Sequence, residues 1–185
     1  MKKNIDKIVT LIFIILLGAS AVYNIAFNNS DKISRIGMIT ALIVGFYFIF
    51  KIRFLEKINE IYLPTLIFLF FATFCARVLN FYSLDCYDKI LHFSSGLLLG
   101  YIGFVLYDLL FENKNDIKGK MIFAITFGIA TAGLWEVWEF SCDEILGMTL
   151  QKSIEDTMYD ITCGSIGAII ISVILKTRFL RRKIA

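Results

Sequence analysis

Six apolar segments, each about as long as a membrane-spanning helix, dominate this 185-residue sequence. A helix needs roughly 20 predominantly apolar residues to cross the hydrocarbon core of a bilayer. The segments cover residues 7–27, 33–50, 61–79, 88–111, 119–140 and 155–175. Because 58% of the chain is hydrophobic and only 19% is charged, a soluble globular domain is excluded. We therefore predict an all-α, polytopic integral membrane protein, with six transmembrane helices bundled into a single transmembrane domain over residues 1–185.

The first apolar segment also has features of a secretory signal. Lys2, Lys3 and Lys7 precede it, and Ala19-Ser20-Ala21 is similar to a signal-peptidase site. The apolar run continues past that site to Phe27, which makes it long enough to cross a bilayer. We expect it to be retained as the first transmembrane helix.

Basic residues are unevenly distributed between the two ends of the predicted helices. Fourteen of the 19 lie at the end shared by both termini, and the other five are Lys32, Arg35, Arg77, Lys89 and Lys152. Since the side richer in Lys and Arg is the cytoplasmic one, we predict cytoplasmic N and C termini. The net charge of +3, without a basic tract interleaved with aromatic residues, gives no indication of a nucleic-acid partner.

Acidic residues follow the opposite pattern and gather where the fourth helix starts, the fifth ends and the sixth starts. Nine of the 16 lie there: Asp85, Asp88, Glu136, Glu139, Asp143, Glu144, Glu155, Asp156 and Asp160. Three pairs share a helical face because their members are three or four residues apart: Asp88 and the only histidine, His92; Glu136 and Glu139; and Asp156 and Asp160. Three segments therefore bring carboxylates to one level of the membrane.

These three pairs predict an acidic intramembrane site that opens to the extracytoplasmic side. A lone carboxylate inside a helix end costs about 2.5–3.5 kcal/mol and turns to a partner or a water-filled cavity. Oxygen ligands with one imidazole suit Mg, Mn or Ca, whereas one histidine excludes a three-histidine zinc site and a di-iron site with two Glu-x-x-His motifs. The candidate metal ligands are Asp88, His92, Glu136, Glu139, Asp156 and Asp160. The candidate catalytic groups are His92, Glu136 and Asp160, and the candidate substrate contacts are Arg77 and Tyr159.

The same stretches resemble a known family. They are Asp88-Lys89-Ile90-Leu91-His92-Phe93, Trp135-Glu136-Val137-Trp138-Glu139-Phe140, and Asp156-Thr157-Met158-Tyr159-Asp160 followed by Gly167-Ala168. They are similar to the signature of the YjdF-like family of uncharacterised bacterial inner-membrane proteins. Their order also resembles the VanZ-like family, linked to glycopeptide-antibiotic tolerance, although that pattern usually has Asn where this chain has Gly164. The resemblance covers residues 60–175 and implies a multi-pass helical fold in the bacterial cytoplasmic membrane with a shared polar site, and it supplies no established reaction.

Several functions are compatible with such a site. The first is a divalent-metal-dependent enzyme that acts on a lipid or isoprenoid phosphate, in which the cation neutralises phosphate charge and a carboxylate or His92 acts as base. The second is a proton- or cation-binding transporter, for which Asp108 and Glu112 are the acids on the inner half of the fourth helix. A non-catalytic sensor or structural protein is the third. In that case the acids form an ion-pair network that fixes three helices together.

Small residues on the fourth and sixth helices predict that these two helices pack closely. They are Ser95, Gly96, Gly100, Gly103, Gly164, Ser165, Gly167 and Ala168.

Overall fold

The computed structural model describes residues 2–27, 30–50, 55–111 and 115–184. Within these residues every regular element is helical, and six segments are long and apolar enough to cross a membrane, which confirms the predicted fold class. Of the basic residues used to predict the orientation, Lys51, Arg53 and Lys114 lie outside the described residues. The chain divides into two compact units, residues 1–85 and 86–185. The single domain and the cytoplasmic termini stay predictions.

The first unit contains three of the six candidate spans. Its elements are α1 (Lys2–Ala26), α2 (Ser30–Ile49), η1 (Leu55–Ile61), α3 (Tyr62–Leu69), η2 (Phe70–Val78) and η3 (Phe81–Ser83). The third span, Ile58–Val78, changes from a 3-10 helix through an α-helix to a π-helix. Where it ends, the Leu79 N–H donates to the Phe74 carbonyl at 3.1 Å, five residues back. π-Helical turns are rare and widen a helix locally.

Tyr62 holds the first unit together at one end of α3. Its hydroxyl forms a 2.7 Å hydrogen bond with the Thr10 hydroxyl of α1, and its ring stacks on Phe46 of α2 with the ring centroids 5.2 Å apart. Leu17 and Ile43 are buried in the same unit. A buried phenol of this kind needs a hydrogen-bond partner, and α1 supplies it.

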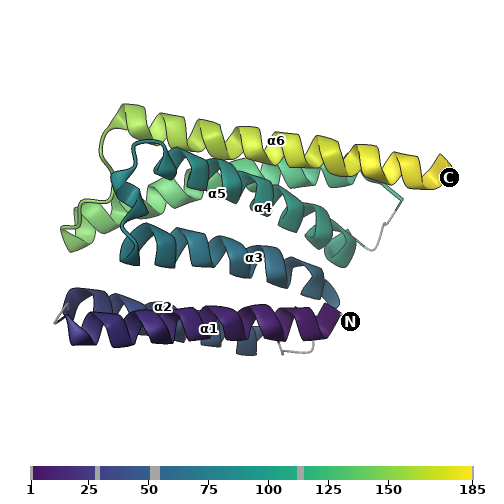
Figure 1. Cartoon of the computed structure of the whole chain (residues 1–185). Coiled ribbons are helices and arrows are strands. Elements are labelled where there is room, and N and C mark those ends of the chain that lie inside the picture. Colours follow the sequence, from purple (N-terminus) through teal and green to yellow (C-terminus); the bar gives the residue numbers. More distant parts are fainter. Residues whose placement is uncertain (1, 28–29, 51–54, 112–114, 185) are drawn as a thin grey trace. The chain divides into compact units, whose positions relative to one another are not determined.

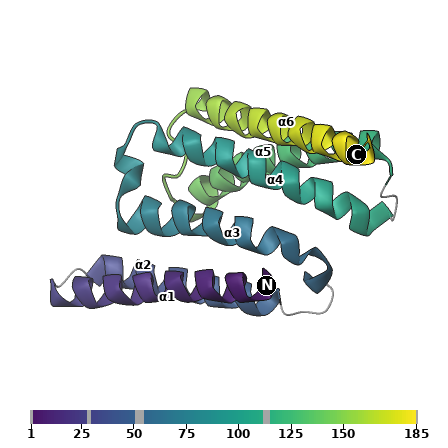
Figure 2. The same cartoon turned by 45° about the vertical axis from the view of Figure 1, so that its right-hand side comes forward.

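The second unit is a bundle of three long helices: α4 (Tyr87–Phe111), α5 (Ile117–Leu146) and α6 (Ile154–Ile184). They lie side by side (Figure 1, Figure 2). α5 continues to Leu146 rather than ending at Phe140 as predicted, because the charged residues Asp143 and Glu144 occupy its last turn instead of a loop. Gly147, with a left-handed φ of 64°, ends the helix there.

Local sequence explains where α5 and α6 begin. The Asp116 side chain accepts a hydrogen bond from the Gly119 N–H at 2.9 Å and so caps α5. Hydrogen bonds from the Tyr107 hydroxyl and the Gly119 N–H hold the pKa of the Asp116 carboxyl below its ordinary value. The Ser153 hydroxyl likewise accepts from the Asp156 N–H at 3.1 Å and caps α6. This cap fixes the start of the helix that carries two of the candidate site residues.

α4 and α6 approach each other through glycines, which confirms the close packing predicted from the small residues. A Cβ atom on Gly96 would overlap the Gly164 carbonyl oxygen, and one on Gly167 would overlap the Phe93 carbonyl oxygen. Backbones can meet this closely only where side chains are absent. The contact sets the spacing of α4 and α6 one turn away from His92.

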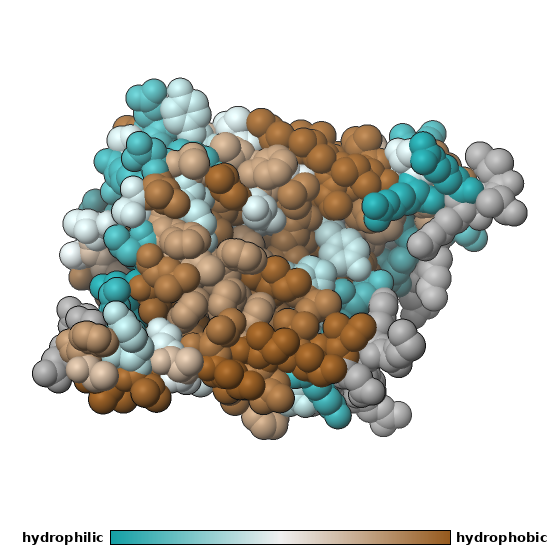
Figure 3. All heavy atoms as spheres, viewed as in Figure 1, coloured by the Kyte–Doolittle hydropathy of each residue, from teal (hydrophilic) through white to brown (hydrophobic). Residues whose placement is uncertain are grey.

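The surface of α6 has the pattern expected of a membrane-spanning helix. Figure 3 shows hydrophobic side chains along its middle and hydrophilic ones towards its two ends. The exposed apolar residues there include Ile166, Ile169, Ile170, Val173 and Ile174. An apolar exposed surface of this length fits lipid contact.

Candidate metal centre

Asp88, His92, Glu136, Asp156 and Asp160 lie close together at one end of the second unit. We call them, together with Lys89 and Lys152, the charged cluster. Asp88 and His92 come from the first two turns of α4, Asp156 and Asp160 from the first two turns of α6, and Glu136 from α5. The first turns of α4 and α6 therefore meet beside Glu136, which lies ten residues before the end of α5.

Three of these side chains direct ligand atoms at one point. One atom each from Asp88, His92 and Asp160 lies within 4.8 Å of the other two. His92 Nε2 is 3.8 Å from Asp88 Oδ1 and 3.7 Å from Asp160 Oδ1, and Asp160 is only 4% exposed. An imidazole nitrogen and two carboxylate oxygens thus surround a small space between α4 and α6.

Glu136 lies on the other side of the imidazole ring. It is 4% exposed, and its Oε1 atom is 3.9 Å from His92 Nδ1. Within the described residues no group donates a hydrogen bond to Oε1. A buried carboxylate oxygen without a donor is costly, because that oxygen has lost its water and gained no hydrogen bond in return. Glu136 Oε1 is therefore suited to a proton, a water molecule or the N–H of His92.

Two lysines enter the cluster. Lys89 Nζ is 2.6 Å from Asp156 Oδ1 and 2.7 Å from Asp160 Oδ1, so it joins α4 to α6. Lys152, in the loop before α6, places its Nζ 2.8 Å from Asp88 Oδ2 and 3.8 Å from Asp156 Oδ2. The hydrogen bond to Asp88 raises the pKa of the Lys152 ammonium. Both lysines neutralise carboxylates for which we predict no basic partner from the sequence.

The loop that carries Lys152 is held by α5. The Asp143 carboxylate accepts hydrogen bonds from the Leu150 N–H at 2.7 Å and the Gln151 N–H at 2.9 Å. The Gln151 side chain in turn donates to the Glu136 carbonyl oxygen at 3.2 Å. From the sequence, we predict Asp143 only as one of nine acids near the outer helix ends. In the structure its carboxylate holds the loop beside the site through these two hydrogen bonds.

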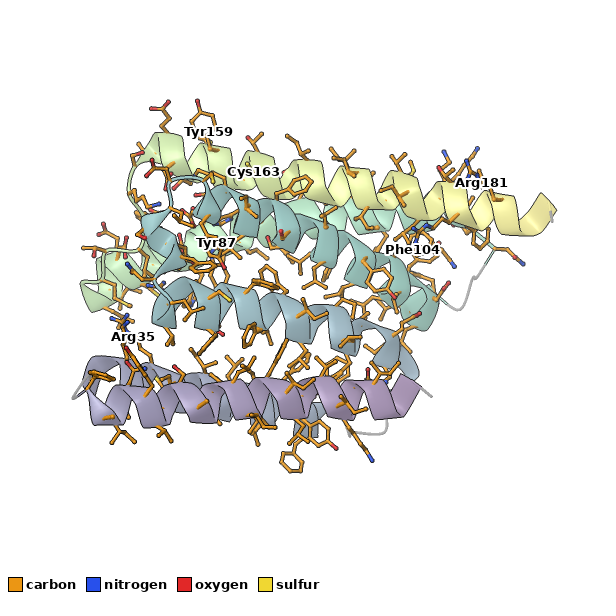
Figure 4. All side chains as sticks on the ribbon, viewed as in Figure 1. Arg35, Tyr87, Phe104, Tyr159, Cys163 and Arg181 are labelled. Atoms are coloured by element: carbon orange, nitrogen blue, oxygen red, sulfur yellow. The ribbon has the colours of Figure 1, made fainter. Side chains whose placement is uncertain are left out.

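The remaining candidate residues have other surroundings. Glu139 is half-buried on α5: its Oε1 accepts a hydrogen bond from Trp135 Nε1 at 3.0 Å, and its charge interacts with those of Asp88 and Asp160. Tyr159 is 56% exposed, near the opposite end of α6 from Arg181 (Figure 4). Arg77 belongs to the first unit, where its guanidinium lies 4.8 Å from the centroid of the Tyr82 ring. Among the described residues, no hydrogen bond or ion pair joins Glu139 or Tyr159 to the three converging ligand atoms.

Comparison with known proteins identifies the family. Residues 7–182 match the family described as "Predicted membrane protein (DUF2238)". The chain belongs to this family. A relative from Thermotoga maritima, described as an "Uncharacterized protein", is 27% identical over 169 residues, which cover 89% of this chain and 87% of the relative. No solved structure matches the chain significantly.

The charged cluster of this DUF2238 chain carries an excess of acid. When all its groups are ionised and His92 is neutral, the carboxylates of Asp88, Glu136, Asp156 and Asp160 face the two ammonium groups of Lys89 and Lys152. The formal excess is two negative charges, which one divalent cation or two protons would balance. In a partly buried site at a helix end, such an excess requires a counter-charge.

The sequence does hold a signal for the two lysines. Lys89 directly follows Asp88, and Lys152 lies four residues before Asp156, close to it in the chain. Both lysines lie at the end of the helices that is poor in basic residues, beside the acids. Basic residues that occur on the poor side next to a group of acids are candidate ion-pair partners.

Proposed function

We propose that this protein is a membrane enzyme that binds one divalent cation between Asp88, His92 and Asp160 and acts on the phosphate group of a lipid or isoprenoid phosphate. One observation carries the proposal: three ligand atoms converge at a point beside His92, and an unpaired buried oxygen of Glu136 faces the other nitrogen of the same ring. The family assignment to membrane proteins supports the location of the substrate in the bilayer.

The spacing of the ligand atoms supports a hard divalent cation. Neighbouring oxygen or nitrogen ligands of an octahedral ion are separated by roughly 3.0 Å for Mg and up to about 3.7 Å for Ca. The separations of 3.7 and 3.8 Å around His92 Nε2 lie at the upper end of this range and slightly above it. Small side-chain movements would therefore be enough to complete the coordination.

Glu136 fits the role of a residue that orients the histidine. A metal-bound imidazole usually donates its second N–H to a carboxylate or carbonyl, which fixes the ring and increases its basicity. Glu136 Oε1 lies 3.9 Å from His92 Nδ1, and a shift of about 1 Å would make that hydrogen bond. This role differs from the metal-ligand role predicted for Glu136.

The chemistry needs few further groups. In hydrolysis, water attacks phosphorus, the bond between phosphorus and the lipid oxygen breaks, and the products are inorganic phosphate and the lipid alcohol. A bound divalent cation would neutralise charge on the phosphate oxygens. A carboxylate of the cluster takes the proton from the attacking water and then returns it to the leaving lipid oxygen, and Asp156, which is partly exposed beside Asp160, is placed to do so. We propose that this site faces the extracytoplasmic side, as the basic-residue distribution implies.

Release of inorganic phosphate tests the activity. Purified protein would be assayed with phosphatidic acid and with a polyprenyl phosphate in the presence of Mg or Mn, for wild type, Asp160→Asn and Glu155→Gln. We expect turnover to fall by at least about 100-fold in Asp160→Asn, because the metal ligand is lost. Glu155→Gln removes an exposed carboxylate from the first turn of α6 and should retain activity. Equal turnover in wild type and Asp160→Asn would contradict the proposal.

The same contacts support one alternative, a structural ion-pair network. Lys89 joins α4 to α6 through Asp156 and Asp160, which is the arrangement expected if the acids only fix the helices. In that case Asp160→Asn would lower stability without any loss of bound metal. A transporter is less well supported, because Gly100, Gly128 and Ala168 meet closely between the two ends of the second unit. Cation flux into proteoliposomes that contain the protein would favour the transporter.

A further inference from the structure

We infer that Lys89 is a resident counter-ion which a divalent cation displaces, and that its released ammonium group then binds the phosphate of the substrate. The inference rests on the proposed function, and it adds the residue that would recognise the anion. It also makes anion binding depend on prior cation binding. From the sequence, we predict Arg77 as a contact for the substrate and assign Lys89 no role.

The inference starts from one shared atom. Asp160 Oδ1 is the oxygen that faces His92 Nε2 at 3.7 Å, and it is also the oxygen that accepts from Lys89 Nζ at 2.7 Å. A cation in the space between Asp88, His92 and Asp160 would lie about 2.1–2.5 Å from this oxygen. Two positive charges would then compete for one carboxylate oxygen inside a site of low dielectric constant. The ammonium group has to move away when the cation binds.

Lys152 provides an internal comparison, because it contacts the same cluster through a different atom. Its Nζ lies 2.8 Å from Asp88 Oδ2, whereas the oxygen that faces His92 is Asp88 Oδ1. It is also 64% exposed, so water screens its charge. Lys152 therefore need not leave when a cation binds, and its removal should matter less.

The released ammonium group is well placed to hold a phosphate. Lys89 precedes His92 by three residues on α4, so its side chain starts on the helical face that carries the imidazole and can place the ammonium group beside the cation. Lysine is a common phosphate ligand that acts as a mobile point charge. Without the cation, both aspartates hold the ammonium group and their negative charges repel an anion. Cation and phosphate should therefore bind in that order.

Cation affinity gives the first test. Mn binding to detergent-purified protein would be measured by calorimetry for wild type, Lys89→Met, Lys152→Met and Lys118→Met, the last being an exposed lysine outside the cluster. We expect Lys89→Met to bind Mn roughly 10- to 100-fold more tightly, since a competing charge-assisted hydrogen bond is gone. Lys152→Met should gain only about two- to threefold, and Lys118→Met should match wild type.

Folding of the variant is measured in parallel. Lys89→Met leaves Asp160 unpaired without metal, so its unfolding temperature should fall below that of wild type and recover when Mn is added. If Lys89→Met does not fold, Lys89→Gln keeps hydrogen bonding without the charge and is expected to show the same increase in Mn affinity.

Anion binding gives the second test. Inorganic phosphate and a short-chain phosphatidic acid would each be titrated into wild type and Lys89→Met, with and without Mn. We expect wild type to bind both ligands only with Mn, the lipid more tightly, and Lys89→Met to bind each about tenfold more weakly. Binding of inorganic phosphate but not of the lipid would keep the role of Lys89 and contradict the lipid substrate.

The outcomes separate this inference from the proposed function. If wild type and every variant bind no Mn, the proposed function itself fails. If wild type binds Mn and Lys89→Met binds it with unchanged affinity, the displacement of Lys89 is contradicted while the metal centre stands. Equal phosphate affinity with and without Mn, or in wild type and Lys89→Met, contradicts the role of Lys89 in anion binding.

Discussion

Gly96→Ala is expected to destabilise the second unit by about 3 kcal/mol or more, because the added methyl group would overlap the backbone of α6. The atom it meets is the Gly164 carbonyl oxygen, and the carbonyl carbon and Cα of Gly164 lie directly behind it. Backbone atoms cannot turn away as a flexible side chain can. α4 and α6 would have to separate, and the Lys89 contacts with Asp156 and Asp160 would be stretched. Thermal unfolding in mild detergent, followed by circular dichroism, measures the effect.

Gly133→Ala is the matched control for this substitution. Gly133 lies within α5, and a Cβ atom there would have nothing within 4 Å. Alanine favours a helix over glycine by up to about 1 kcal/mol, so this variant should be as stable as wild type or slightly more stable. Equal unfolding temperatures for Gly96→Ala and Gly133→Ala would show that α4 and α6 do not pack as described.

Asp108→Ala is expected to destabilise the protein by about 2–3 kcal/mol, because it leaves the ammonium group of Lys120 buried without a carboxylate. Lys120 Nζ lies 2.6 Å from Asp108 Oδ1 and 2.7 Å from Oδ2, and the lysine side chain is only 3% exposed. The rings of Phe104 and Phe179 lie on either side, each with its centroid 5.3 Å from Nζ. This expected loss of stability is smaller than that usual for a broken buried ion pair, because Asp108 is partly exposed. Denaturant unfolding in detergent measures the change.

A double substitution distinguishes the charge from the packing. Asp108→Leu combined with Lys120→Met removes both charges and keeps similar volume, so we expect stability to return to within about 1 kcal/mol of wild type. Lys118→Ala, at an exposed position two residues away, should change little. If Asp108→Ala were as stable as wild type, Lys120 would have to be reached by water or be neutral in the folded protein.

The fold was predictable because the bilayer constrains it so strongly. Length and apolarity alone place all six candidate spans, since a chain in hydrocarbon must satisfy its backbone within helices. The ends of the helices were less predictable. Asp143 and Glu144 read as loop residues, whereas they form the last turn of α5, and Asp143 uses its charge to hold the loop that follows. Charge at a helix end marks the membrane boundary and does not mark the end of the helix.

The candidate site was predictable in part. Helical spacing was sufficient to bring His92 together with Asp88 and Asp160, because the positions at which α4 and α6 start fix a common level. Spacing could not show that Glu139 accepts a hydrogen bond from Trp135, because Trp135 and Glu136 both lie about one helical turn before it. It also could not show that Lys89 reaches across to α6, because the long lysine stem allows many directions. Packing between helices decides these contacts.

The number of metal ions bound per chain shows whether Asp88, His92 and Asp160 form a metal centre. Protein purified in mild detergent would be equilibrated with Mn, freed of unbound ion, and measured by elemental mass spectrometry as wild type, His92→Ala, Asp160→Asn and Glu155→Gln. The account predicts about one Mn per chain in wild type and Glu155→Gln, and little or none in His92→Ala and Asp160→Asn. The same Mn content in all four proteins, or none in wild type, would contradict a metal centre between Asp88, His92 and Asp160.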